Sequence, residues 1–215
     1  MDFFGILLPG SLATWLVTQY IPPKTLREAL SFGLGDSTAN PDLFVLGAAF
    51  LLSSYLLGHF VFMAGGKLDP IYDRWRKSAK PKDRDVAFLE AEKIQKKLTP
   101  GLVGGDFSTL KWARAYLQVK APTARVEIDR LEADSKFFRS LIVVAALAAA
   151  HFLLREQSPV AGVAALAMAG LSYLRFKDQR WKMTEVCYGT AVIAYEVNPP
   201  EQSERSPDTS DGEAQ

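Results

Sequence analysis

The sequence predicts an all-α integral membrane protein with four transmembrane helices, long cytoplasmic helical extensions and a disordered acidic C-terminal tail. Three observations predict it. Four blocks contain no Asp, Glu, Lys or Arg, most basic residues lie in one central stretch, and apolar residues outside the blocks recur at helical spacing. The average composition, 48% hydrophobic with a net charge of +1, resembles that of a soluble protein. This average hides the segregation of apolar and charged residues along the chain.

The first two blocks differ in length. Phe3–Ile21 has 19 residues and Leu43–Gly66 has 24. About 20 apolar residues span a bilayer core of about 30 Å, so the second block suffices and the first does so narrowly. Pro9 lies in the first block, where it kinks a helix beyond its first turns. Asp2 stands where a signal peptide carries basic residues, so we expect a retained helix and no cleaved leader.

The last two blocks are short and close together. Ser140–Leu154 has 15 residues, Pro159–Leu174 has 16, and four residues separate them, which predicts a tight helical hairpin. Arg139 and Arg175 flank the hairpin at the ends opposite the turn, where their side chains can contact lipid headgroups or anions. The alternative is a protein with two spans, in which both short blocks are buried core helices.

The distribution of basic residues predicts the orientation. Residues 67–139 hold 17 Lys and Arg, the chain from Arg175 holds five, residues 22–42 hold two and the hairpin turn holds one. With four spans, the two basic stretches and both termini share one side. The positive-inside rule makes that side the cytoplasm, and we expect the bacterial inner membrane.

The predicted organisation has five segments. Helical spacing, with no strong helix-breaking residue inside either range, also predicts continuous helices over 123–154 and 160–197. Each of them would pass between membrane and cytoplasm. The segments are a pair of transmembrane helices (1–66), a cytoplasmic helical region (67–136), a transmembrane hairpin (137–174), a cytoplasmic helix (175–197) and a disordered tail (198–215).

Two side-chain patterns predict association of helices. Trp181, Tyr188 and Tyr195 recur every seven residues, and the segment Thr123–Lys136 is the expected cover for this aromatic stripe. Small residues at four-residue spacing let helices approach closely in lipid. They pack within the hairpin or between subunits, and we expect a homo-oligomer. This spacing is shown by Ala145 and Ala149 and by Ala146 and Ala150 in the third block, and by Ala161, Ala165 and Ala169 in the fourth.

Few polar residues lie inside the blocks. His59 follows Tyr55 by one helical turn, and the pair is either a proton relay or gate, or a hydrogen bond between packed helices, with the second favoured. His151 is expected near the outer membrane face as an interfacial side chain. Four aspartates have basic neighbours, which favours a solvated charged surface over a cation site; they are Asp69, Asp73, Asp83 and Asp85.

The sequence favours a protein that is not an enzyme. No acid–base pair or nucleophile–base set occurs at the spacing that catalysis requires, and no metal ligand cluster or cofactor motif is present. Cys187 is the only cysteine and is expected to pack in a core. The glycine-rich segment 101–106 lacks the Gly-Lys-Ser/Thr ending of a phosphate loop, so we expect a hinge there. The balanced charge argues against nucleic-acid binding.

Several short motifs carry a resemblance. Tyr55–His59, Leu68–Arg74, Pro9-Gly10 and Lys136–Ser140 together resemble an uncharacterised family of bacterial multi-span inner-membrane proteins. That resemblance covers most of residues 3–195 and implies no active site. The arrangement of residues 137–195, two spans followed by a cytosolic helix, is similar to the two-span membrane effector modules of bacterial defence systems.

These observations favour a membrane-embedded interaction or effector protein. Its cytoplasmic helices would receive a protein partner, its spans would contact membrane lipids and assemble, and its activity would be to perturb the membrane in defence or signalling. The alternative is a transporter or channel subunit that uses the Tyr55–His59 face. A selective pathway needs several polar lining groups, and their scarcity favours the first interpretation.

Overall fold

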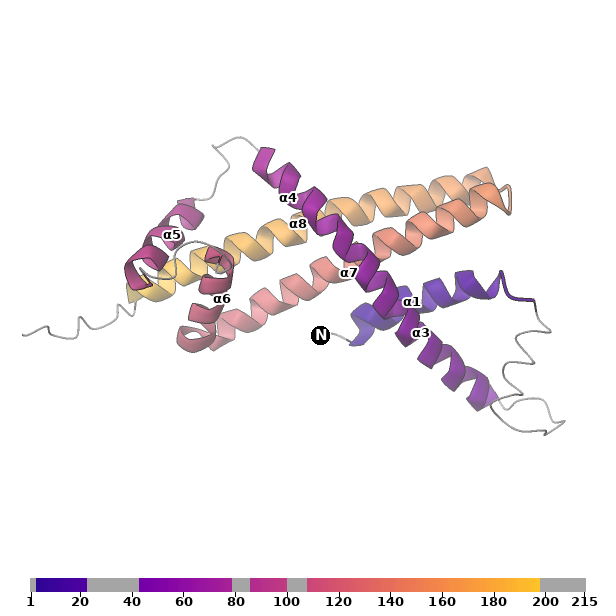
Figure 1. The fold of residues 1–215 in the computed structure, drawn as a ribbon, viewed down its shortest axis with the longest axis horizontal. Helices are drawn as coiled ribbons and strands as arrows, with labels where there is room; N and C mark the ends of the chain where they lie inside the picture. Colours follow the sequence, from indigo (N-terminus) through magenta and orange to yellow (C-terminus); the bar gives the residue numbers. More distant parts are fainter. Residues whose placement is uncertain (1–2, 23–42, 79–85, 100–107, 198–215) are drawn as a thin grey trace, which may run out of the picture. The chain divides into compact units, whose positions relative to one another are not determined.

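The computed structural model describes residues 3–22, 43–78, 86–99 and 108–197 (Figure 1). Every regular element within these ranges is a helix, and none of them holds a strand, which confirms the all-α prediction. The chain forms two compact units. The first contains Met1–Arg84 and Val126–Thr184, and the second contains Asp85–Arg125 and Glu185–Gln215.

Three helical segments are long and apolar enough to cross a membrane: Phe44–Arg76, Pro122–Leu154 and Pro159–Val197. They indicate a membrane protein. The first apolar block forms a shorter helix, α1 (Phe3–Thr18), of 16 residues. At 1.5 Å per residue it is about 24 Å long, against a bilayer core of about 30 Å. The structure therefore gives spanning length to three of the four predicted spans.

The second block continues beyond its apolar part. Helix α3 (Leu43–Gly65) leads through the short 3-10 helix η1 (Gly66–Leu68) into α4 (Asp69–Ser78). Pro70 has no N–H to donate to the carbonyl of Gly66, four residues earlier. The N–H of Asp69 donates to that carbonyl instead, which is the tighter bond of a 3-10 helix. The chain thus passes the proline without leaving the helical direction.

Glycines allow α1 and α3 to cross closely. A Cβ atom on Gly10 would overlap the carbonyl oxygen of Ser54, and one on Gly58 would overlap the carbonyl oxygen of Ile6. Ser54 is fully buried at this crossing. The same unit has an apolar core in which α1, α3 and α7 (Pro122–Leu154) meet; its buried members are Ala13, Leu16, Val61 and Val144.

Helices α7 and α8 (Pro159–Val197) form the predicted hairpin, and both continue without a break as expected (Figure 1). In the turn, the N–H of Arg155 donates to the carbonyl of His151, and the N–H of Ser158 donates to that of Phe152. Gln157 has a φ of 48°, in the left-handed region. This is the usual way to end a helix and satisfy its last carbonyls.

The second unit contains two short helices, α5 (Val86–Leu98) and α6 (Thr109–Lys120), and the final part of α8. The side chain of Ser108 caps α6 by accepting a hydrogen bond from the N–H of Lys111. The core of this unit is apolar, and its fully buried members are Ala91, Ala113, Leu117, Cys187 and Ala191. The hinge predicted at 101–106 and the acidic tail lie outside the described residues.

Candidate functional site

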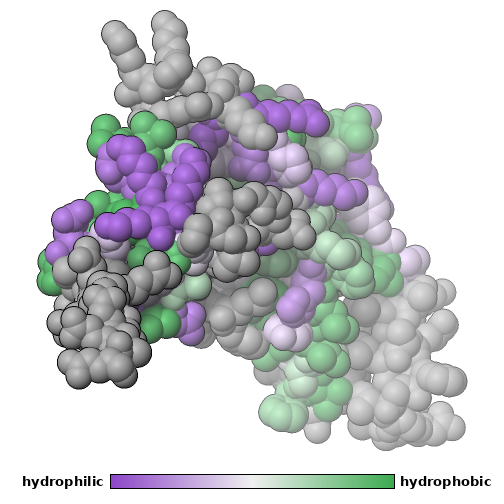
Figure 2. Space-filling model, turned by 60° about the vertical axis from the view of Figure 1, so that its left-hand side comes forward, coloured by the Kyte–Doolittle hydropathy of each residue, from purple (hydrophilic) through white to green (hydrophobic). Residues whose placement is uncertain are grey.

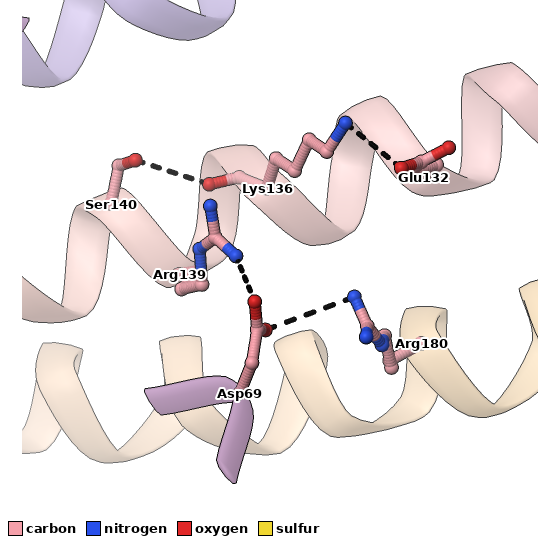
Figure 3. A network of polar contacts seen from close by, with 6 residues as sticks. All are labelled: Asp69, Glu132, Lys136, Arg139, Ser140 and Arg180. Carbon is pink, nitrogen blue, oxygen red and sulfur yellow. Dashed lines mark hydrogen bonds and ion pairs between the residues drawn. The ribbon is translucent and has the colours of Figure 1, made fainter. Parts of the chain in front are cut away.

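A buried ion pair joins two helices of the first unit where their apolar segments meet charged sequence. Nη1 of Arg139 donates to Oδ2 of Asp69 at 2.5 Å (Figure 3). The side chain of Arg139 is 6% exposed and that of Asp69 is 28% exposed. The pair links α7 to the first residue of α4, across 70 residues of sequence.

A second guanidinium shares the carboxylate. Nη1 of Arg180, on α8, lies 3.7 Å from the other oxygen of Asp69 (Figure 3). The guanidinium of Arg180 also lies 5.9 Å from the ring centre of Tyr72. The rings of Tyr72 and Phe176 are buried and meet edge to face. Asp69 is therefore the residue through which α4, α7 and α8 are held together. The aromatic contact of Tyr72 with Phe176 lies next to it, beside Arg180.

Two residues of α3 shape the space for Arg139. Its guanidinium lies 4.9 Å from the ring centre of Phe62, within the range of a cation–π interaction. A Cβ atom on Gly65 would lie 3.2 Å from Cγ of Arg139, closer than ordinary contact. Gly65 thus leaves room for the aliphatic part of the Arg139 side chain beside α3. The ring of Phe62 then contacts the guanidinium group.

A second ion pair lies one turn away on α7. Nζ of Lys136 is 2.8 Å from Oε1 of Glu132, and the hydroxyl of Ser140 donates to the carbonyl of Lys136 (Figure 3). Lys136, Arg139 and Ser140 mark the sequence position at which α7 changes from charged to apolar.

The cluster around Asp69 is suited to holding helices together. Its polar groups are the carboxylate of Asp69 and the guanidinium groups of Arg139 and Arg180, and guanidinium groups keep their protons in proteins. Breaking a buried pair leaves a charge without its partner and costs about 3–5 kcal/mol, while replacing the whole pair with apolar groups is often neutral. The pair therefore fixes which helices meet.

Arg139 has a protein partner, and its side chain is buried. A contact of Arg139 with lipid or an anion stays a prediction. Arg175 is exposed and pairs with Asp178 on its own helix at 3.2 Å. Asp69 is 28% exposed and pairs with Arg139 and Arg180, two partners that its neighbours in sequence did not predict. Sequence spacing carries no information about a contact between residues 70 positions apart.

Tyr55 and His59 lie together on the exposed face of α3. Their rings meet edge to face with centres 4.6 Å apart, and Tyr55 is 38% exposed. The pair thus faces outward from the unit, away from the crossing with α1. A role in a relay or gate stays a prediction.

His151 forms a cluster that sequence reasoning missed. It is buried, with Nδ1 3.0 Å from the hydroxyl of Tyr20 and Nε2 3.6 Å from Oε1 of Glu156. The guanidinium of Arg155 lies 4.5 Å from the ring centre of Tyr20. Burial of His151 shows that it packs against protein, and its place at the membrane interface stays a prediction. A signal was present, because both Tyr20 and His151 stand near the predicted outer ends of their blocks.

Two residues of the aromatic stripe have ring contacts on other helices. In the first unit, Trp181 contacts Trp75 of α4, with ring centres 6.4 Å apart. In the second unit, the ring of Phe88 on α5 lies 5.3 Å from that of Tyr188, which is buried. Helices α4 and α5 thus supply ring contacts that the sequence did not predict. Cover of the stripe by Thr123–Lys136 stays a prediction.

The alanine face of α8 lies partly within the hairpin. Ala161 and Ala165 line an apolar cavity of about 360 Å³ together with residues of α1 and α7, and Ala165 is buried. Ala169 is half-buried. These placements agree with packing inside the hairpin and leave a use between subunits as a prediction.

Within the described residues, no group of three or more His, Cys, Asp or Glu side chains could hold a metal ion. The fold and the buried ion pair define a helical protein in which three described helical segments are long and apolar enough to cross a membrane and are tied together where the apolar sequence ends. Comparisons with protein families, with curated proteins and with solved structures find no match to this chain.

Proposed function

We propose that the protein is a membrane-embedded interaction protein that assembles with a second copy of itself. In this proposal four spans anchor it in the bacterial inner membrane, with both termini in the cytoplasm. The cytoplasmic end of α8 provides the contact, and a further protein partner binds the cytoplasmic helices. Assembly would then act on the membrane, as in the effector modules that residues 137–195 resemble.

The observation that supports assembly is an apolar seam on the last part of α8. Val186, Ile193 and Val197 are exposed, at 36%, 62% and 70%. With Thr190 they follow 4-3-4 spacing, which places them on one face of the helix, as in the contact of two coiled helices. Hydrophobic and hydrophilic residues lie side by side on the face drawn in Figure 2.

Exposed apolar side chains outside a membrane favour contact with another protein. Full burial of an Ile or Val side chain contributes about 1.5–3 kcal/mol, so a second copy of the seam would supply a useful driving force. The transporter alternative receives less support. Tyr55 and His59 face outward from the described unit, and the buried charges of the first unit are already paired with each other.

The test is the oligomeric state of the full chain in nanodiscs, measured by native mass spectrometry. Wild type is expected to be dimeric or larger. Ile193→Glu is expected to be monomeric, because it places a carboxylate in the seam. Leu89→Glu is the matched control, since Leu89 is also exposed but lies on α5. A wild-type protein that is monomeric at every accessible concentration refutes the proposal.

A further inference from the structure

A cavity of about 480 Å³ opens in the first unit beside the buried ion pair. Its apolar wall includes Ile6 of α1, Phe62 of α3 and Phe137 of α7. Its polar wall consists of charged residues on the two turns of α7 that precede Phe137. The volume lies within the range of about 300–1,000 Å³ that is usual for pockets that bind small molecules.

The cavity lies where three apolar segments end. Ile6 is near the start of the first apolar block, Phe62 is near the end of the second, and Phe137 is just before the third. In a membrane, such ends lie at the boundary between hydrocarbon and headgroups. The apolar wall therefore faces the level of acyl chains, and the charged wall faces the level of lipid headgroups.

The charged wall carries both signs. Lys136 and Glu132 pair at 2.8 Å, and their side chains are 31% and 14% exposed. Asp129 and Arg130 complete the wall. A ligand that offers only a phosphate would meet two carboxylates as well as two cations. A ligand with a phosphate and a primary amine offers a partner of opposite charge to each kind of group.

We propose that this cavity binds a membrane phospholipid whose headgroup combines a phosphate with a primary amine, as in phosphatidylethanolamine. The phosphate would contact Lys136 and Arg130. The ammonium would donate hydrogen bonds to Glu132 and Asp129, which the quaternary ammonium of a choline headgroup cannot do. The first part of an acyl chain would lie against Phe62 and Phe137. This binding does not depend on assembly through α8.

The test uses the full chain and native mass spectrometry with phosphatidylethanolamine, phosphatidylcholine or phosphatidylglycerol of the same acyl chains. We expect retention of phosphatidylethanolamine to exceed that of the other two by about tenfold, the effect of one hydrogen bond to a charged group. Ala133→Phe fills the cavity and is expected to abolish the preference. Ala146→Phe, on an exposed position of the same helix, is expected to keep it.

Two further arms make the result decisive. Glu132→Gln keeps the size of the side chain and removes its charge, so it should reduce the preference for the ethanolamine over the choline lipid even if Ala133→Phe folds poorly, while Asp129 and the amide oxygen remain as acceptors. Glycerophosphoethanolamine, the soluble headgroup, should compete weakly because it lacks acyl chains. Equal retention of all three lipids, a preference for phosphatidylglycerol, an unchanged preference in Glu132→Gln, or equal binding of the soluble headgroup would each overturn the proposal.

Discussion

Separating Asp69 from Arg139 should reveal how strongly the buried pair holds the helices together. Asp69→Leu leaves two guanidinium groups, those of Arg139 and Arg180, without their shared carboxylate. Loss of one partner of a buried pair costs about 3–5 kcal/mol. For a protein of this size 1 kcal/mol changes the melting temperature by about 2–4 °C, so we expect a decrease of roughly 6–20 °C.

Arg139→Met should cost less than Asp69→Leu. The carboxylate that remains is 28% exposed and still has Arg180 at 3.7 Å. The double variant restores an apolar contact in place of the pair, and it should be more stable than Asp69→Leu alone by about 1–3 kcal/mol. Thermal unfolding in one detergent, followed by circular dichroism, gives all four values of a double-mutant cycle.

The cycle has a clear negative outcome. If the two single changes are additive, Asp69 and Arg139 do not interact in the folded protein, and the assignment of the site is wrong. Glu127→Leu with Arg130→Met provides a matched control. That pair is separated by 2.8 Å, against 2.5 Å for Asp69 and Arg139, but it lies one turn apart on α7 with side chains 49% and 67% exposed. It should show a coupling of only about 0.3–0.5 kcal/mol.

Three further predictions concern other parts of the chain. Gly10→Ala should lower the melting temperature, because the added Cβ would overlap the carbonyl oxygen of Ser54. Gly47→Ala, which has open space around it, should raise the stability by about 0.5–1 kcal/mol. Equal effects of the two changes in thermal unfolding would contradict the close crossing of α1 and α3. Burial, and secondarily Tyr195, raises the pKa of Tyr116 above its usual 10.0, so the folded state holds the phenol proton more tightly. Its stabilising contribution is therefore present below pH 10 and is lost as the pH rises through the raised pKa, and Tyr116→Phe should make alkaline unfolding less steep. In a Cys187→Ser background, Ser158→Cys should react with a membrane-impermeant maleimide in intact cells, and reaction only after lysis would contradict the proposed topology.

The helices and their turns were largely predictable because they depend on local sequence. The hairpin follows from two apolar blocks separated by Arg155–Ser158, and the start of α7 follows from Pro122, which suits a first turn. The continuation of α3 into α4 was harder to see. It depends on a local adjustment of hydrogen bonds at Pro70, which apolar patterning does not record.

The contacts between helices were not predictable, because helical periodicity indicates a face and not the partner of that face. Asp69 had basic neighbours in sequence, yet its partners come from α7 and α8. His151 was expected as an interfacial side chain, and its partner Tyr20 lies 131 residues earlier in the sequence. The same limit applies to the aromatic stripe, where the ring contact of Tyr188 with Phe88 of α5 was not predicted.

The two polar clusters act on opposite ends of the apolar part of α7. Arg139 ties its first turn to α4, and His151 ties its last turn to the end of the first apolar block through Tyr20. The two residues are twelve positions apart in sequence, which corresponds to about 18 Å of helix. A helix held by polar contacts at both ends cannot slide along its neighbours without breaking one of them, since a shift of one residue moves a side chain by about 1.5 Å along the axis and by 100° around it. Helix α8 has no such second tie among the described contacts of its apolar segment, and Val163, Leu166 and Leu171 on that segment are exposed. If the hairpin repacks when copies assemble, α8 is therefore the helix that moves, while α7 keeps its register.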